Sequence, residues 1–504
     1  MSPQTHQYSF LAISSKSTGM LSGVKAACFL FGVAALAAFS VFAAGPASVP
    51  APSSAAAPVS APAAPGATAA AAPSDSAAAS TRAQAPEEIR AHAQNKVFQL
   101  LTRVADGAEK RSYGTAFVVD PHGWLITNFH VVAAAVLEPS KYVTELKIEN
   151  VAKAARVFSY DIGNDLALVR VENTFTDAYR LATRVLVPGE KLYSIGLPQD
   201  TVMTIIEGLF SDLRRSGPIS RIFLSAPLNA GMSGGPVVNA YDELVGVNDA
   251  MLRDAQNISI AVPGEAVATL VANVANGRSP AATAPANEVR DQIGATLFPW
   301  LSAWNVRTGT KLSLNGASLF GRFFIAEPPI GMKCWEDVRD VASVGPKLRM
   351  RICQNPEAFP ITGSGRMGGH MDIRYQQLDA KSQRLTSLVS AGRWVGLLKS
   401  QTSGQFDRSS LDTEASRSAR FVCHHRFTRN SRGLPLLAEY CVADLPTLAG
   451  VFDTVLTIVP LSEGHSSGLL GEMVLHGFTE RETLLASQTF MDGITESPGS
   501  AVAN

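Results

Sequence analysis

The sequence predicts a mainly β protein with two folded domains, and three observations support this fold class. The chain has 504 residues, too many for one hydrophobic core. Short alternating apolar runs separated by turn residues fill residues 114–263, a pattern typical of an all-β barrel or sandwich. Further strand-like runs, such as KLRMRIC and FDTVLTIV, follow an Ala/Pro-rich stretch that predicts a linker at residues 277–289. We therefore expect a second, β-rich domain at residues 290–490, followed by a disordered tail at residues 491–504.

The N-terminal segment is predicted to direct export. Lys16 and Lys25 precede an apolar run at residues 26–44, and small residues near the end of this run suit a signal peptidase. The run is also long enough to remain as a membrane anchor, so residues 1–44 are read as a signal peptide or an anchor. Residues 45–86 are almost entirely Ala, Pro and Ser, which predicts a disordered tether. The following residues 97–104 fit a helix and a strand equally well.

The charge balance and the cysteines restrict the class of protein. Lysines and arginines number 43 against 43 aspartates and glutamates, which leaves no net field to attract nucleic acid. Besides Cys28 in the apolar run, the chain has Cys334, Cys353, Cys423 and Cys441, an even set that predicts two disulfides in an oxidising compartment. The motif CHH at residues 423–425 lacks a close second cysteine pair, so a structural role is favoured over a metal site.

Hairpin register predicts how the four cysteines pair. Residues of two antiparallel strands face each other when their numbers average to the centre of the turn. The average of 423 and 441 falls in the turn-like sequence NSRG, and that of 334 and 353 falls beside VGP. This predicts the disulfides Cys334–Cys353 and Cys423–Cys441. A short helix over the residues after Cys334 would break the first register.

A further hairpin turn is predicted at Asn315-Gly316, and an exposed loop is predicted at Arg214-Arg215.

The first of three chemical motifs is GTAFVVDPHGWLITNFHVV, at residues 114–132. Its DPHG turn joins two strands, and the second strand leads to His130. A histidine at a strand end can keep its backbone buried while its ring points into a cleft. Alone, such a histidine is more often a satisfied core side chain, so its assignment depends on the other motifs.

The second motif is YDIGNDLALVRV, at residues 160–171. Asp165 opens an apolar strand, so its carboxylate can be buried and still accept a hydrogen bond from an imidazole N–H. Asp161 is the nearest competitor for this role. By itself, an aspartate before a strand is usually a turn or cap residue.

The third motif is NAGMSGGPVVN, at residues 229–239. A serine hydroxyl is a poor nucleophile until a base takes its proton, and the oxyanion that develops must be met by fixed donors. We expect the backbone N–H groups of Gly231 and Ser233 to be these donors, while Gly234 and Gly235 remove side chains that would crowd a substrate. The alternative interpretation of this segment is a glycine-rich turn between strands.

The three motifs occur in the order His, Asp, Ser, the order of chymotrypsin-like enzymes. From about residue 114 to 263 the sequence resembles the trypsin-like serine peptidases, most closely their bacterial high-temperature-requirement (HtrA-like) branch. The resemblance implies a chymotrypsin-like double β-barrel, placed at residues 87–276, with the active site between the barrels. Carried over by position, His130 is the expected general base, Asp165 its orienting carboxylate and Ser233 the nucleophile.

The sequence departs from this family at two places. Met232 stands where the bacterial branch has asparagine and digestive relatives have an aspartate that pairs with a newly cut N-terminus; a thioether cannot form that ion pair. No PDZ-like segment is recognisable after residue 277. In the family, the residue six before the nucleophile lies at the base of the specificity pocket. Here it is Pro227, and with Leu228 and Asn229 it predicts a pocket for apolar residues before the scissile bond.

The sequence thus predicts a serine endopeptidase of the bacterial cell envelope that acts through an acyl-enzyme and needs no cofactor or metal. It is expected in the periplasm, anchored to the inner membrane facing the periplasm, or secreted. Its expected partners are polypeptides, including unfolded envelope proteins, and not nucleic acid; the sequence carries no signal for an oligomeric state. The alternative is a protease-like scaffold that acts through its C-terminal domain while the triad is weak or silent.

Overall fold

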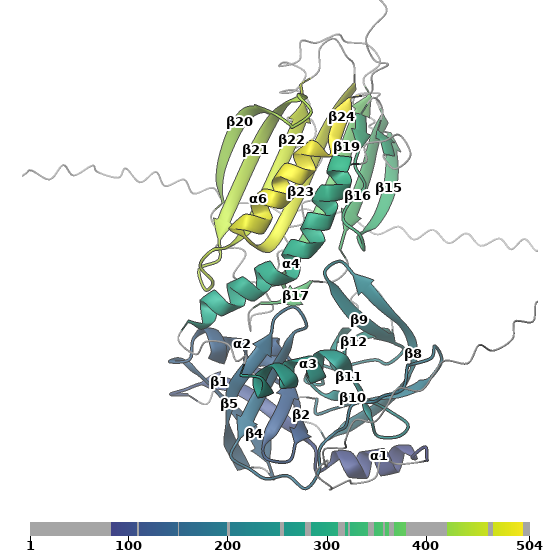
Figure 1. The fold of residues 1–504 in the computed structure, drawn as a ribbon, viewed down its shortest axis with the longest axis vertical. Helices are drawn as coiled ribbons and strands as arrows, with labels where there is room; N and C mark the ends of the chain where they lie inside the picture. The colour runs from purple at the N-terminus through teal and green to yellow at the C-terminus, as the bar shows by residue number, and fades with distance from the viewer. Residues whose placement is uncertain are drawn as a thin grey trace, which may run out of the picture. The chain divides into compact units, whose positions relative to one another are not determined.

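The computed structural model describes residues 82–496 except residues 108–109, 150, 199–201, 252–256, 278–283, 311–317, 321–322, 341–346, 356–357, 362–366, 380–420 and 462–466 (Figure 1). The predicted signal or anchor, most of the predicted tether, the Asn315-Gly316 turn and residues 497–504 of the predicted tail lie outside the described residues. Among the helices that the structure describes, none is both long and apolar enough to cross a membrane.

The described chain begins with a helix and a strand. Helix α1 (Pro86–Ala93) starts at the last residue assigned to the tether, and the Glu88 carboxylate accepts a hydrogen bond from the Ala85 amide at 3.0 Å. Residues 97–104, which fitted helix and strand equally well, form strand β1 (Val97–Val104) because they pair with a neighbouring strand on each side.

Two closed six-stranded barrels confirm the predicted chymotrypsin-like double barrel. The first has the strand order β1-β2-β3-β6-β5-β4, and the second has the order β10-β11-β12-β9-β8-β7. After β1, the strands of the first barrel are β2 (Lys110–Asp120), β3 (Trp124–Thr127), β4 (Tyr142–Ile148), β5 (Val151–Asp161) and β6 (Leu166–Val171). Those of the second are β7 (Lys191–Gly196), β8 (Thr204–Ser216), β9 (Ile219–Leu224), β10 (Pro236–Asn239), β11 (Leu244–Met251) and β12 (Ser259–Pro263).

Burial along the strands follows the sequence pattern. Strand β4 alternates buried and partly exposed residues over most of its length, as a strand with one wet face does, whereas almost every residue of β6 is buried. Helix α2 (Phe129–Leu137) follows β3, and helix α3 (Gly264–Ala275) follows β12. The prediction of a loop at Arg214-Arg215 is wrong, because both residues lie on β8 and pair with β9. Their predicted exposure is confirmed.

The region after the barrels contains a seven-stranded antiparallel sheet with the order β15-β16-β19-β23-β22-β21-β20. Figure 1 shows helices α4 (Pro285–Thr310) and α6 (Glu480–Asp492) side by side across one face of this sheet. The strands of the sheet are β15 (Lys333–Asp340), β16 (Lys347–Gln354), β19 (His370–Asp379), β20 (Val422–Arg429), β21 (Pro435–Asp444), β22 (Val451–Pro460) and β23 (Ser467–Thr479). The smaller sheets are β13-β14-β24 and β17-β18, formed by β13 (Ser318–Phe320), β14 (Phe323–Ile325), β24 (Ile494–Glu496), β17 (Phe359–Pro360) and β18 (Met367–Gly368).

Helix α4 is the largest difference from the prediction. It begins within the predicted 277–289 linker and extends through the start of the predicted β-rich domain. Val289, Ile293 and Leu297 recur every fourth residue and are fully buried, so one stripe of the helix belongs to the hydrophobic core. The Ala/Pro-rich composition at its start concealed this stripe.

The predicted tail also begins too early. Helix α6 continues to Asp492, and strand β24 pairs with β14 through Glu496. Phe490 and Ile494 are fully buried, which explains why the chain stays in the core past residue 491.

The structure pairs the cysteines as the hairpin register predicts. Cys334 lies opposite Cys353 on β15 and β16, and Cys423 lies opposite Cys441 on β20 and β21. Both pairs are disulfide-bonded. The residues after Cys334 continue the strand, so the helix that would have broken the register does not form.

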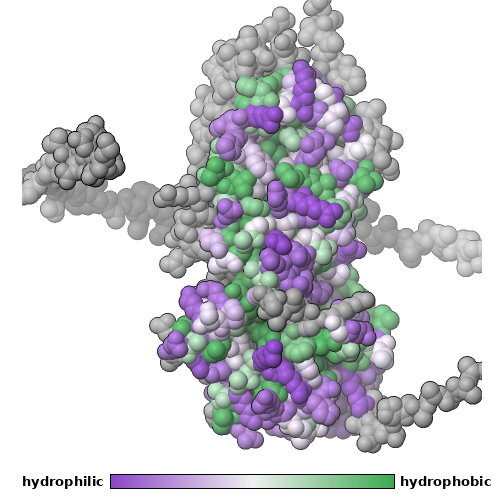
Figure 2. Space-filling model, turned by 60° about the vertical axis from the view of Figure 1, so that its left-hand side comes forward, coloured by the Kyte–Doolittle hydropathy of each residue, from purple (hydrophilic) through white to green (hydrophobic). Residues whose placement is uncertain are grey.

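Each disulfide joins an edge strand of the seven-stranded sheet to its neighbour. Strands β15 and β20 are the two edges, and each carries exposed large apolar side chains, namely Trp335 and Val338 on β15 and Val422 and Phe427 on β20. On the face drawn in Figure 2, hydrophobic and hydrophilic residues are interspersed over the surface. The edge strands are therefore weakly buried elements that a covalent bond holds in place.

Candidate active site

His130 is the second residue of helix α2, and not the end of a strand as the sequence suggested. Strand β3 ends at Thr127, and Asn128 connects it to the helix. The Asn128 side chain donates a hydrogen bond to the Asp165 carbonyl oxygen at 2.9 Å, and the Phe129 amide donates to the same oxygen at 3.1 Å. The start of the helix that carries His130 is thus tied directly to the backbone of Asp165.

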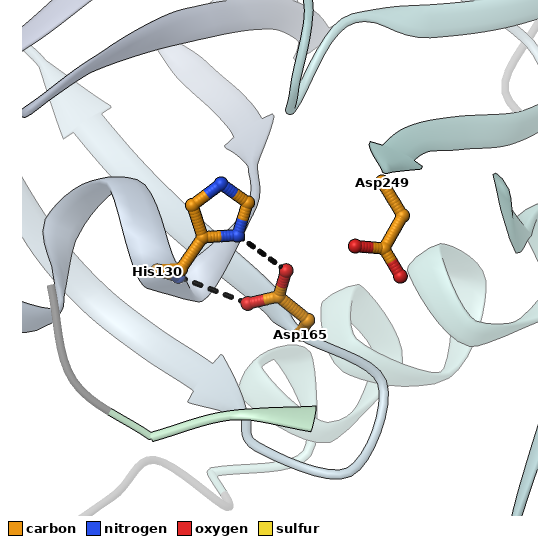
Figure 3. Close-up of side chains that lie close together, drawn as sticks. All are labelled: His130, Asp165 and Asp249. Atoms are coloured by element: carbon orange, nitrogen blue, oxygen red, sulfur yellow. Dashed lines mark hydrogen bonds and ion pairs between the residues drawn. The ribbon is translucent and has the colours of Figure 1, made fainter. Parts of the chain in front are cut away.

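Asp165 occupies the last position before β6 and has a left-handed backbone, with φ of 55°. Its side chain is fully buried, and both of its oxygens are used by His130. The His130 amide donates to one oxygen at 2.9 Å, and the ring Nδ1 lies 2.6 Å from the other (Figure 3). Asp161, the competing aspartate, accepts hydrogen bonds from Asn164 and stabilises the turn before Asp165.

Ser233 lies in the turn that leads into β10. Its carbonyl oxygen accepts a hydrogen bond from the Thr115 amide at 2.8 Å, which links this turn to the first barrel. Its hydroxyl donates to the carbonyl oxygen of Asp249 at 3.0 Å. Within the described part of the chain, no hydrogen bond joins the Ser233 hydroxyl to His130.

The two glycines after Ser233 have a different role from the one expected. A Cβ on Gly234 would lie 2.3 Å from the Thr115 carbonyl oxygen, and one on Gly235 would lie 2.1 Å from the Ile195 carbonyl oxygen. Gly234 also has a φ of +83°. These glycines therefore permit close packing of the turn against the protein's own backbone, rather than making room for a substrate.

The segment before Ser233 is held by its own packing. Met232 is fully buried, its amide donates to the Asn229 carbonyl oxygen at 3.0 Å, and its Cα and side chain fill the space above Gly196. Gly231 has a φ of +95°, and its carbonyl oxygen accepts a hydrogen bond from the Thr115 hydroxyl at 2.7 Å. Among the described residues, neither the Gly231 amide nor the Ser233 amide donates to another protein group, so both are available to an incoming oxygen.

The expected pocket residues differ in burial. Leu228 is buried, whereas Pro227 and Asn229 are exposed. The exposure of Pro227 does not fit a residue at the base of a pocket. Leu228 is the apolar side chain of this segment that the structure buries.

Asp249 is the site residue that sequence reasoning missed. It lies on β11, 7% exposed, and its carboxylate faces the His130–Asp165 pair in Figure 3. A carboxylate oxygen of Asp249, a ring nitrogen of His130 and a carboxylate oxygen of Asp165 all lie within 4.8 Å of one another. The Arg221 Nε donates to Asp249 at 2.9 Å, and the Arg221 side chain is 1% exposed. The signal in the sequence was a single acid in LVGVNDAM, an otherwise uncharged strand.

Burial and charge shift both members of the His130–Asp165 pair. Burial acts to lower the pKa of His130, but the charges of Asp165 and Asp249 and the hydrogen bond to Asp165 outweigh it, so the pKa is raised. Burial raises the pKa of Asp165, the neighbouring charge of Asp249 adds to this, and the contacts with His130 oppose it. Asp249 therefore acts electrostatically on both side chains.

The same three side chains offer ligand atoms of the kind that bind metals. The other contacts of the cluster favour a different use. Both Asp165 oxygens accept hydrogen bonds from His130, and Asp249 is already neutralised by the Arg221 guanidinium. A cation at this place would compete with Arg221, so the arrangement is better suited to holding a protonated imidazole.

Known proteins resemble the barrel region. Residues 114–247 match the family described as trypsin-like peptidase domain. The chain is 33% identical over 170 residues to a putative serine protease HhoB of Synechocystis sp., covering 32% of this chain and 40% of the relative. It is 29% identical over 165 residues to a probable periplasmic serine endoprotease DegP-like of Pseudomonas fluorescens, covering 31% and 33%.

Solved structures match the same region. The Rv3671c protease of M. tuberculosis in its active form aligns with a TM-score of 0.34 and 20% identity, over 40% of this chain and 93% of that one. The chain spans less than half the length of the curated relatives named above. The matched segment contains His130, Asp165 and Ser233. Residues 114–247 are thus a trypsin-like peptidase domain, related to those of the HtrA and DegP-type serine proteases.

Proposed function

We propose that this chain is a serine endopeptidase of the cell envelope, with His130, Asp165 and Ser233 as its catalytic triad. The observation that carries the proposal is the His130–Asp165 contact, in which a fully buried carboxylate lies 2.6 Å from the ring Nδ1 and leaves Nε2 free to act as a base. The assignment of Ser233 to the same centre is supported by its hydroxyl, which donates to the backbone carbonyl oxygen of Asp249, the residue whose carboxylate faces His130.

The proposed reaction begins with a rotation of the Ser233 hydroxyl. In the free protein this hydroxyl donates to the Asp249 carbonyl oxygen, so it must turn to donate to His130 Nε2. The oxygen then attacks the scissile carbonyl carbon while its proton passes to Nε2, and Asp165 stabilises the imidazolium without taking the proton. The amides of Gly231 and Ser233 receive the oxyanion.

The rest of the reaction uses the same side chains, with His130 acting first as an acid and then again as a base. The imidazolium donates its proton to the leaving amine, the peptide bond breaks, and an acyl-enzyme remains on Ser233. A water molecule then loses a proton to His130 and attacks the ester carbonyl carbon. Ser233 leaves with that proton, so the enzyme returns to its starting state without a cofactor.

The proposed substrates are polypeptides, including unfolded envelope proteins. The buried Leu228 and the absence of an acidic residue in PLNAG, residues 227–231, favour an apolar side chain before the scissile bond. The apolar run at residues 26–44 supports export to the periplasm or retention at the inner membrane, and the Ala/Pro-rich residues 45–86 would then act as a tether. One of the relatives is named as a periplasmic endoprotease.

We further propose two functional domains: a peptidase domain ending near residue 276 and a C-terminal domain that begins with helix α4. The second candidate function is a protease-like scaffold that acts through this C-terminal domain. The described sheet has seven strands and two disulfides. A structure of this size favours a separate function for the C-terminal region.

A fluorophosphonate probe separates the two functions. Such probes form a covalent bond with a serine only when a base activates it, so an active triad should be labelled at one position. We expect peptide mapping to find the label on Ser233, and no labelling in Ser233→Ala. His130→Ala keeps the serine but removes the base, and it should also remain unlabelled. An unlabelled wild-type protein with intact near-UV circular dichroism would favour the scaffold.

A further inference from the structure

A buried ion pair of the second barrel reaches the His–Asp pair of the first barrel. Arg221 lies on β9 and Asp249 on β11, two strands separated by β12 in the sheet order. His130 and Asp165 follow β3 and precede β6 of the first barrel. Asp249 therefore brings a charge from one barrel to within 4.8 Å of the charged pair in the other.

The stability of the barrel does not explain this ion pair. Removing two charges from water is unfavourable for each ion, and apolar side chains of similar size often stabilise a core at least as well. The Arg221–Asp249 pair is 1% and 8% exposed, so it bears this cost in full. In addition, Arg221 Nη2 is buried without a hydrogen-bond partner among the described residues. A buried pair with an unsatisfied donor at an active site suggests a functional role.

Residue 249 lies beside both the proposed base and the proposed nucleophile. Its carboxylate faces His130, and its carbonyl oxygen accepts the hydrogen bond of the Ser233 hydroxyl. The two oxygens of Asp165 are fully used by His130. The second carboxylate is thus an additional negative charge beside a ring that already has its orienting partner.

We propose that Asp249, held by Arg221, is a positioning residue that stabilises the protonated form of His130 during the reaction. This inference rests on the proposed peptidase function. Arg221 fixes the direction of the Asp249 carboxylate through the hydrogen bond from its Nε at 2.9 Å. Without Arg221, the Asp249 carboxylate would lose its fixed direction and draw the imidazole away from its productive orientation.

Among the residues that the structure describes, the other charged groups near His130 are directed elsewhere. Helix α2 has no acidic residue in its first turn and no basic residue in its last. Asp161, in the turn before Asp165, is bonded to Asn164. On helix α4, which packs against α2, Glu288 accepts a hydrogen bond from Gln292. The charges that act on His130 are therefore Asp165 and Asp249, with Arg221 behind Asp249.

The proposal predicts opposite effects for the two members of the pair. Asp249→Asn removes a negative charge and leaves Arg221 unneutralised, so the pKa of His130 should fall and the acid limb of kcat/KM should move to lower pH. Arg221→Gln leaves the Asp249 charge unneutralised, so the limb should move to higher pH. Asp249→Asn should also lower the plateau of kcat by about tenfold with little change in KM.

The test combines pH profiles with a readout that needs no activity. We would record kcat/KM against pH with a peptide substrate, and titrate His130 by ¹⁵N NMR in the Ser233→Ala background. The resonance is assigned by its loss in His130→Gln. Asp249→Glu keeps the charge and should restore the wild-type limb. In the double variant Asp249→Asn/Arg221→Gln the opposite effects should largely cancel.

The matched control is a second buried ion pair that the structure describes in the barrel region. Asp242 is 2.6 Å from the buried Lys96 and has a φ of 62°, a conformation that asparagine also adopts, so Asp242→Asn should fold. It should leave the His130 titration unchanged, because Asp242 contacts no triad residue that the structure describes.

The outcomes are distinct. Opposite shifts in Asp249→Asn and Arg221→Gln support the proposal. Unchanged titrations, or shifts of both variants in the same direction, overturn it. A wild-type protein that cleaves nothing and takes no serine probe, while His130 still titrates as predicted, would contradict the peptidase function and leave the electrostatic role of the pair standing.

Discussion

The barrels and the seven-stranded sheet manage strand edges in different ways. Both barrels close on themselves, so they have no unpaired edge, and both disulfides of the described residues lie outside them. The sheet is open, and each disulfide joins an edge strand to its neighbour. Closure by hydrogen bonds suffices where a barrel can form, while an open sheet with exposed apolar edges is cross-linked.

The barrels are also the region that contains the strained backbone conformations and buried charges of the site. The barrels contain residues in left-handed conformations at the site, such as Asp165 and Gly234, and a cluster of buried charges. Such conformations and charges cost free energy and persist only where the surroundings fix them. The closed barrels therefore provide a rigid frame for the proposed chemistry, and we expect changes at the sheet edges to leave that chemistry intact.

The largest expected effect is on activity in the barrel region. Asp165→Asn keeps the size of the side chain and tolerates the left-handed backbone, yet it cannot stabilise the imidazolium, so kcat/KM should fall about 10⁴-fold. His130→Ala should cause a similar loss, and the two losses should not add. The measurement is peptide hydrolysis at saturating and limiting substrate.

The control for this prediction is Asp161→Asn. Asp161 bonds to Asn164 in the same turn but does not contact His130 through any described hydrogen bond, so the loss should stay below about tenfold. An equal loss in Asp161→Asn and Asp165→Asn would mean that the turn matters and the buried carboxylate does not.

The next largest effect concerns the stability of the barrels. Gly234→Ala places a Cβ 2.3 Å from the Thr115 carbonyl oxygen at a φ of +83°, so the free energy of unfolding should fall by about 3 kcal/mol or more. Gly189→Ala is the matched variant, because Gly189 also has a positive φ, +91°, but nothing lies within 4 Å of its Cβ position. It should cost only about 1 kcal/mol.

Urea denaturation followed by tryptophan fluorescence measures both glycine variants. Equal destabilisation would show that backbone conformation alone accounts for the effect and that the close contact with Thr115 does not.

A comparable effect of about 3 kcal/mol is expected in the sheet alone. Replacing Cys423 and Cys441 by serine removes a cross-link that spans 18 residues of sequence, and a loop of this size contributes about that much. Amide hydrogen exchange in β20 should accelerate. At the same time kcat/KM should stay at the wild-type value; a parallel loss of activity would contradict the separation between barrels and sheet edge.

The smallest expected effect is a shift of the pH profile. The pKa of His130 is raised above its ordinary value of 6.5, and in the proposed mechanism the ring can accept the Ser233 proton only when it is neutral. Activity should therefore fall as the pH drops through a value above 6.5. The midpoint of the acid limb in a plot of kcat/KM against pH measures this pKa. An acid limb below the ordinary value would mean that burial outweighs the two carboxylates.

Much of this architecture was predictable, for physical reasons that differ between regions. Short strands in a barrel or sandwich were predicted because alternating apolar residues and turn residues identify them, and the double barrel was implied by the resemblance to the trypsin-like peptidases. The disulfides were predicted because register places opposed residues at equal distances from a turn. The prediction that His130 ends a strand was wrong, because the residue lies in the helix that follows. The sequence FHVVAAAVL carries no polar face that would distinguish a helix from a strand.

The features that were missed depend on tertiary contacts. Helix α4 was hidden by an Ala/Pro-rich start, and its buried stripe has meaning only against the core that it covers. Asp249 was missed because its role needs Arg221 and His130, which are distant in sequence and come from different strands or helices. The use of Gly234 was misread because the atom that it must approach, the Thr115 carbonyl oxygen, lies on another barrel strand.

The most direct test of the account is cleavage of casein by the wild-type protein and by Ser233→Ala. If Ser233 is the nucleophile, the wild type should produce casein fragments and the variant should be slower by about 10⁴-fold or more, with unchanged near-UV circular dichroism. A Ser233→Ala protein that cleaves casein at the wild-type rate, or a folded wild type that produces no fragments, would contradict the central claim that this barrel centre is a working serine peptidase.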